Sequence, residues 1–228
     1  MVGPDDGDTR ALPAYGDLPA RSWFLAPPLR LVSRLKSAVV TLYTVQTREA
    51  YETFVREGVL LGDPTLGEPS FQEAYCWMLR QMDARLPPPR EGLLWLWANP
   101  SRRRLWSNAK LSSGEVLLTV RVHRDRILLS EFSDWHMVLN RGLHVPRFPG
   151  EAAAAWEARA DALDNEFECE AEPHRDLPLA EWPTNLRSRL ETSWEAIFDP
   201  ATWSANSWIQ ATMRELHPED VVRAVRIR

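Results

Sequence analysis

Polar side chains interrupt three largely apolar stretches of the sequence, and such positions often bind ligands or take part in catalysis. Gln46 ends the run 38–45, Gln210 lies between apolar neighbours, and the polar segment 130–136 directly follows another apolar run. A buried amide or hydroxyl requires a hydrogen-bond partner, and polar groups just beyond a strand often line a cleft. Each position is therefore a candidate for contact with a ligand, and equally for a hydrogen bond inside the protein.

His136 is the titratable side chain at the end of segment 130–136. An imidazole near a carboxylate, here Asp134, can titrate near neutral pH and transfer protons, whereas a glutamine amide can bind ligand hydroxyl groups. We predict that three side chains carry the chemistry: Gln46, His136 and Gln210. The alternative for the segment is structural, with Ser130 or Ser133 capping a helix and His136 bonded to the backbone.

Polar and aromatic residues beside these three are expected to contact a bound ligand: Tyr43, Thr44, Trp97, Arg102, Ser130, Asp134 and Trp135. Trp97 is one of 11 tryptophans, most of which we expect in the core, with a minority stacked on a ligand. Arg102 begins the run 102–104, inside a segment (101–126) of net charge +5. This segment could bind a phosphate, or it could be a solvated face, as could the segment 151–181 of net charge −8.

Several common site motifs are absent from the sequence. There is no P-loop, no G-x-G-x-x-G dinucleotide motif and no G-x-S-x-G nucleophile elbow. The five histidines and two cysteines show no metal-ligand spacing, so we expect no metal. Cys76 is expected to be buried on the apolar face of a helix. The net charge of −5 disfavours a protein dedicated to nucleic acid.

The sequence shows neither a secretory signal nor an apolar run that approaches the roughly 20 residues of a membrane span. We therefore expect a cytoplasmic protein with no membrane partner. Residues 1–20 are rich in Gly, Pro and Asp, and we expect residues 1–37 to form a loose arm. Residues 38–228 have the size of one domain.

The elements that must position the candidate residues follow from periodicity and caps. Strands are predicted at 39–47, 93–98, 115–122, 126–129, 207–213 and 221–228. Helices are predicted at 48–57, 70–86, 131–140, 151–163 and 185–198, with an acidic loop at 164–183. Thr47 and Gly58 would bound the first helix, and Ser70 with Glu73 would form a capping box on the second. The irregular alternation favours an α+β fold with a mixed, largely antiparallel core sheet and flanking helices. We expect Gln46, the segment ending at His136, and Gln210 to meet in one pocket.

Five strings of the sequence resemble a bacterial family known as domain of unknown function 3841. They are YTVQT, YCWM, LLSEFSDWHMVLN, SWEAIFD and IQAT, and they occur in this order along the chain. The resemblance covers about residues 40–228 and brings no established activity with it.

A more distant resemblance connects the strand Leu42-Tyr43-Thr44 and the helix that ends at Gly58 with ADP-ribosyltransferase-type folds. Such proteins bind NAD in a cleft between two small sheets, and a Glu on a late strand holds the nicotinamide ribose. Gln210 takes the place of that Glu, and segment 43–46 has no counterpart of their first-strand His or Arg. The resemblance implies a nucleotide-dependent transferase, most concretely NAD-dependent ADP-ribosyl transfer, with residues 102–104 at the pyrophosphate. The alternative is a non-catalytic binding or regulatory protein that uses a Trp-lined cleft for a small molecule or a protein partner.

Overall fold

A computed structural model describes residues 37–88, 91–99, 105, 114–203 and 207–227. The predicted arm, apart from residue 37, and Arg102 lie outside these ranges. None of the helices in them combines the length and the apolar character needed to cross a membrane.

The core is a six-stranded sheet in the order β5-β6-β3-β1-β4-β8, in which each neighbouring pair is antiparallel. Its strands are β1 (Val39–Gln46), β3 (Leu94–Trp97), β4 (Val116–His123), β5 (Leu128–Glu131), β6 (Ile209–Met213) and β8 (Val221–Arg226). A two-stranded sheet joins β2 (Leu60–Leu61) to β7 (Glu215–Leu216). The predicted α+β class with a largely antiparallel core is confirmed.

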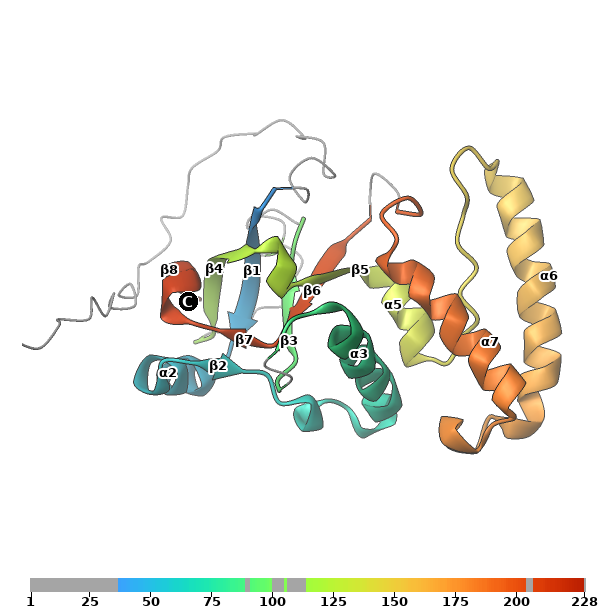
Figure 1. Ribbon diagram of the computed structural model, residues 1–228, viewed down its shortest axis with the longest axis horizontal. Coiled ribbons are helices and arrows are strands. Elements are labelled where there is room, and N and C mark those ends of the chain that lie inside the picture. Colours follow the sequence, from blue (N-terminus) through green and yellow to red (C-terminus); the bar gives the residue numbers. More distant parts are fainter. Residues whose placement is uncertain (1–36, 89–90, 100–104, 106–113, 204–206, 228) are drawn as a thin grey trace, which may run out of the picture.

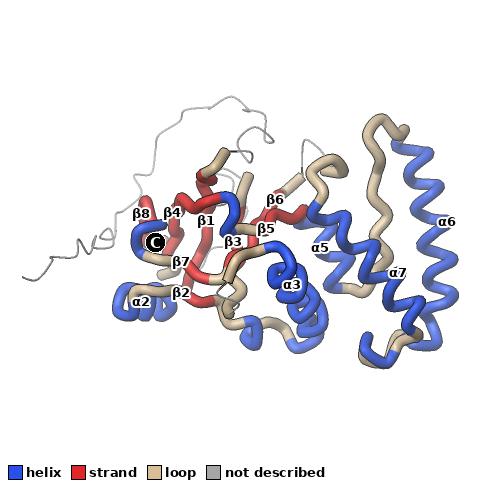
Figure 2. The backbone as a smooth tube through the Cα atoms, viewed as in Figure 1, coloured by secondary structure: helices blue, strands red, loops and turns tan. Residues whose placement is uncertain are grey.

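The longer helices are α2 (Arg48–Glu57), α3 (Gln72–Arg85), α5 (Phe132–Leu139), α6 (Ala153–Ala171) and α7 (Thr184–Trp194). Short 3-10 turns lie at Pro64–Leu66, Pro69–Phe71, Arg124–Arg126, Glu172–His174, Leu179–Glu181, Glu195–Phe198 and Pro218–Asp220. In Figure 1, α2 lies below one end of the sheet, whereas α5, α7 and α6 follow one another outward from the β5 end. The tube in Figure 2 shows the same division between a strand-rich part and a helical part.

The sheet separates two apolar cores, because side chains alternate between the faces of a strand. On one face, Leu42 and Leu118 of the central strands pack with Tyr51 and Phe54 of α2; we call this the α2 face. On the other face, the hydroxyl of Thr212 lies 3.9 Å from Met78 Sδ of α3; we call this the α3 face. Residues of α3, α5, α6 and α7 form the core beneath it.

The predicted ends of α2 are confirmed. The Thr47 side chain accepts a hydrogen bond from the Ala50 N–H at 3.1 Å, and Gly58 ends the helix at φ 72°. A positive φ costs glycine little, because it has no Cβ.

The predicted start of α3 is wrong in its details. The helix begins at Gln72 after a 3-10 turn, and no side chain caps it. Glu73 instead accepts a hydrogen bond from the Leu179 N–H at 2.7 Å and pairs with Arg141 at 2.6 Å. Its carboxylate therefore joins distant segments of the chain rather than closing its own helix.

Cys76 is exposed, contrary to the prediction that it is buried. The buried stripe of α3 runs through Ala74, Trp77 and Met78. Cys76 lies two residues from both Ala74 and Met78, and residues two apart on a helix do not share a face. Cys76 therefore lies beside the buried stripe rather than on it.

The expected acidic loop at 164–183 is also wrong in its first part, because α6 continues to Ala171. Phe167 and Ala171 are fully buried and hold this turn in the core. The neighbouring acidic residues are neutralised from α7, where Arg189 pairs with Glu166 at 2.9 Å and with Glu170 at 3.2 Å. Apolar contact and charge pairing together keep an acidic segment helical.

Strand β8 contains one extra residue relative to β4. Thr119 is paired with Arg223, but the next residue, Val120, is paired with Val221. Val222 is thus the unpaired residue of a β-bulge, and its side chain is 54 % exposed.

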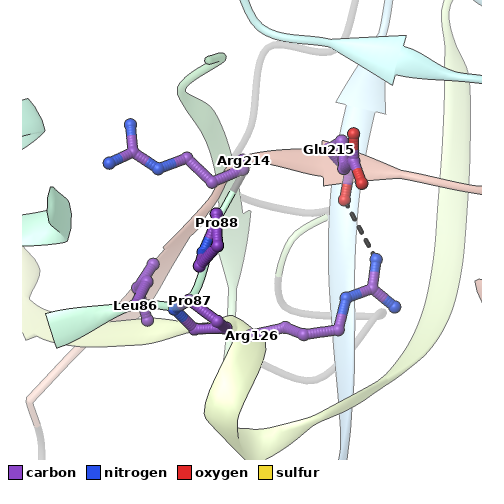
Figure 3. Close-up of a pocket in the computed structure, with 6 residues that line it drawn as sticks. All are labelled: Leu86, Pro87, Pro88, Arg126, Arg214 and Glu215. Atoms are coloured by element: carbon purple, nitrogen blue, oxygen red, sulfur yellow. Dashed lines mark hydrogen bonds between the residues drawn. The ribbon is translucent and has the colours of Figure 1, made fainter. Parts of the chain in front are cut away.

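An ion pair between Arg126 and Asp220 joins the start of β5 to the turn before β8. The guanidinium donates to both carboxylate oxygens, at 2.7 and 2.9 Å, and to the Glu215 backbone oxygen at 3.2 Å. Figure 3 shows Arg126 reaching Glu215 beside a cavity of about 120 Å³. Asp220 is 7 % exposed and also accepts from the His217 N–H at 3.0 Å. Its carboxylate raises the pKa of Arg126 by hydrogen bonding.

We expect Arg126→Met to lower the free energy of unfolding by about 3–5 kcal/mol, because it leaves the buried Asp220 carboxylate without its partner. Urea unfolding measures the loss. The matched control is Arg56→Met, which removes an exposed pair with Glu57 and should cost less than about 1 kcal/mol. Equal, small losses in both variants would contradict the assignment of the Arg126 pair as buried.

Candidate functional site

Four of the predicted site residues lie side by side across the sheet. Tyr43 is paired with Trp97, Trp97 with Gln210, and Gln210 with Ser130. Directly opposite residues on neighbouring strands point to the same face, with Cβ atoms about 4.5–5.5 Å apart. We call Tyr43, Trp97, Gln210 and Ser130 the cross-strand row. It lies on the α3 face, because Gln210 is two residues from Thr212 on the same strand.

Gln210 is a buried, hydrogen-bonded amide. It is 4 % exposed, and its Nε2 donates to Ser130 Oγ at 3.2 Å. Among the described residues, this is the only hydrogen bond that its side chain forms. Ser130 is fully buried, so one N–H of the amide and the serine hydroxyl are partners inside the sheet.

Aromatic rings surround one end of the row. The Trp97 ring lies edge to face with Phe132 at 4.9 Å and with Trp208 at 5.4 Å between centroids. Asn99 fixes the approach to β6: its amide donates to the Ser207 backbone oxygen, and its Oδ1 accepts from the Ile209 N–H at 2.8 Å. Our sequence analysis missed Phe132, Trp208 and Asn99, although all three lie within two residues of predicted site positions.

His136 lies at the rim of this aromatic group. Its ring stands edge to face on Phe132 at 4.7 Å, and its Nδ1 is 2.8 Å from the Phe132 backbone oxygen. The side chain is exposed. The Phe132 ring therefore lies between His136 and Trp97. The contact of His136 with the backbone is the one that the structural alternative predicted for this segment.

Asp134 and Trp135 turn away from the row. Asp134 Oδ2 lies 3.2 Å from Nε2 of His144, not of His136, because residues two apart on a helix do not face each other. Trp135 is 4 % exposed and packs between Trp95 and Tyr75, with centroids 5.1 and 6.3 Å away. The structure thus places Trp135 in the core.

Gln46 and Thr44 belong to the α2 face, because they differ from Tyr43 by an odd number of residues on one strand. Thr44 Oγ1 donates to the Trp95 backbone oxygen at 3.0 Å and accepts from Gln46 Nε2 at 2.8 Å. The expected convergence in one pocket therefore does not include Gln46, whose amide instead bonds within its own strand.

Glu131, and neither Ser130 nor Ser133, caps α5. Its side chain accepts from the Asp134 N–H at 2.7 Å. It is 4 % exposed, and burial raises the pKa of its carboxyl group. A glutamate cap is uncommon, which is why the two serines were the expected residues.

Two further cavities formed by described residues lie away from the row. One, of about 440 Å³, lies between α3 and α7 and includes Cys76 and Arg80 in its lining. The other, of about 410 Å³, is lined by Ala38, His123, Arg124 and Asp125. No group of three or more His, Cys, Asp or Glu side chains within the described ranges could hold a metal ion.

The comparisons with known proteins identify a family. The family model described as domain of unknown function (DUF3841) matches residues 41–222, which include all four residues of the cross-strand row. The chain belongs to the DUF3841 family. Searches of curated proteins and of solved structures gave no match.

For this DUF3841 chain we expect Gln210→Ala to lower the free energy of unfolding by about 1–3 kcal/mol, because it leaves the buried Ser130 hydroxyl without its partner. Gln46→Ala is the matched control, since it removes a glutamine amide from a less buried site on the same sheet. Thermal or urea unfolding of both variants measures the difference. A loss no larger for Gln210→Ala than for the control would contradict the hydrogen bond to Ser130.

We further expect Glu131 to make the stability of this DUF3841 chain depend on pH. Since burial raises the pKa of this carboxyl in the folded state, its contribution is fully present below the unfolded pKa. It is lost as the pH rises through the higher folded value. Glu131→Gln should remove this decline. The variant should therefore gain stability relative to the wild type as the pH rises from about 4 towards neutrality, and the gain should begin near the acidic end of this range. A pH-independent difference between the two proteins in urea unfolding would refute the effect.

Proposed function

We propose that this protein is a nucleotide-dependent transferase, most concretely an NAD-dependent ADP-ribosyltransferase-like enzyme, with its site at the cross-strand row. The observation that carries the proposal is the register that aligns Gln210 of β6 with Trp97 and with Tyr43 of β1. The resemblance to ADP-ribosyltransferase-type folds implies a ribose-binding residue on a late strand, and Gln210 occupies that position. The alignment of Gln210 with Tyr43 of the first strand, through Trp97, supports the resemblance independently of the sequence strings.

The residues of the row and its aromatic neighbours fit the parts of a nucleotide. The Trp97 ring is half-buried and offers a surface for a flat base or nicotinamide ring, for which aromatic stacking is favourable. The Gln210 amide and the Tyr43 hydroxyl can bond ribose hydroxyl groups. NAD, when bound, supplies an ADP-ribosyl group on a good leaving group, and the protein orients it and excludes water.

Charge favours a second candidate, a non-catalytic binding protein on the same surface. The side chains of the cross-strand row are all neutral at pH 7, and Gln210 already donates to Ser130. A neutral amide stabilises a developing positive charge much less than a carboxylate does. Within the row, binding is therefore better supported than catalysis.

Two measurements separate these candidates: stabilisation by NAD, and release of nicotinamide. A ligand at 100 times its dissociation constant stabilises the folded state by about 2.7 kcal/mol, so NAD and ADP-ribose should raise the melting temperature. We expect Gln210→Glu to raise nicotinamide release by about 10²-fold, the usual size of one electrostatic contribution to a transition state. The matched control, Gln46→Glu on the α2 face, should change neither quantity.

The results for stabilisation and for nicotinamide release decide between the two candidates. Stabilisation by NAD without nicotinamide release, in the wild type and in Gln210→Glu, would replace the enzyme by the binding protein. The absence of stabilisation by NAD and by ADP-ribose would refute both candidates.

A further inference from the structure

The α3 face continues beyond the cross-strand row as a polar stripe along β1 and β4. Tyr43 is paired with Thr119, and two residues farther along, Thr41 is paired with Arg121. On the edge strand, Arg223 is paired with Thr119. We call Thr41, Thr119, Arg121 and Arg223 the basic stripe.

Within the part of the chain that the structure describes, the two arginines of the basic stripe have no ion-pair partner. Arg121 and Arg223 are exposed, and neither forms an ion pair with another residue in the described ranges. They lie on neighbouring strands: Arg223 of β8 is opposite Thr119, and Arg121 is two residues from Thr119 on the same face of β4. Two adjacent, unpaired guanidinium groups repel each other, and an anion between them removes that repulsion.

The stripe lies between two features that a dinucleotide would need. At one end is the cross-strand row. At the other, two residues past Arg121, His123 lines the cavity of about 410 Å³ together with Ala38, Arg124 and Asp125. His123 is four positions along β4 from Thr119, a distance of about 13–14 Å. The order along the sheet is therefore aromatic and amide groups, then two arginines, then a cavity.

We infer that Arg121 and Arg223 bind the diphosphate of a dinucleotide, whose ribose and nicotinamide end lies at the cross-strand row and whose adenosine end extends towards His123. This inference rests on the proposed function. Guanidinium groups suit this role, because they form paired, charge-assisted hydrogen bonds with phosphate oxygens. Strand alternation holds both arginines on the face that carries Gln210, so one ligand can contact both groups.

The test is calorimetric titration of the full chain with ADP, adenosine and NAD. We expect Arg121→Gln and Arg223→Gln each to weaken ADP and NAD binding by about 10-fold or more, the usual effect of losing one charge-assisted hydrogen bond. Adenosine, which has no phosphate, should bind these variants as it binds the wild type. Arg56→Gln on α2 is the matched control, because it removes an exposed arginine that is distant from the α3 face, and it should change nothing.

The outcomes distinguish this inference from the proposed function. If NAD binding depends on Gln210 but survives both arginine substitutions, the diphosphate assignment is overturned and the proposed function stands. If ADP binding depends on the arginines but Gln210→Ala leaves NAD binding unchanged, the diphosphate site stands and the proposed function falls. Failure of ADP to bind the wild type, or binding only of single-stranded oligonucleotides, overturns the inference.

Discussion

Strand β6 is buried on both faces, and this constraint governs the rest of the structure. Each of its five residues is buried, with Ile209, Ala211 and Met213 in the core of the α2 face. The alternate residues, Gln210 and Thr212, are polar and face the other core, where each forms a hydrogen bond. A polar residue in a strand covered on both sides is retained only if the neighbouring strands supply partners. Strand β5 does so through Ser130 and the backbone of Leu128, which fixes the order of these strands.

The sequence predicted the elements whose signals are local. The Thr47 cap and the Gly58 terminus of α2 both depend on residues within a few positions of each other, and the structure has them. Glu73 and the end of α6 were predicted wrongly, because their environment comes from distant segments. Leu179 and Arg141 engage Glu73, and Arg189 stabilises the acidic turn of α6. No local rule contains those contacts.

The candidate site was predictable in part for the same reason. Polar residues inside apolar strings indicated that Gln210 and Ser130 need hydrogen-bond partners, but the strings carry no strand order. Once the order β5-β6-β3-β1 is known, simple alternation assigns Tyr43 and Trp97 to the same face and Gln46 to the other. The composition of the sequence indicated that segment 101–126 is basic. The strand register places Arg121 of this segment on the same face as Arg223, which is 102 positions away along the chain.

The bulge at Val222 divides β8 into two segments of opposite phase. On the side of Arg223, the strand alternates in step with Thr119, whereas Val221 returns to the α2 face opposite Val120. If β8 kept all its residues but paired with β4 without a bulge, Val222 would lie opposite Val120, and Val221 would share the face of Arg223 and leave the core. The bulge thus lets one strand of six residues place Val221 in the core of the α2 face and Arg223 on the α3 face. The register therefore tolerates the deletion of Val222: Val221 would then precede Arg223 directly, and ordinary alternation along the strand would keep the two side chains on opposite faces of the sheet.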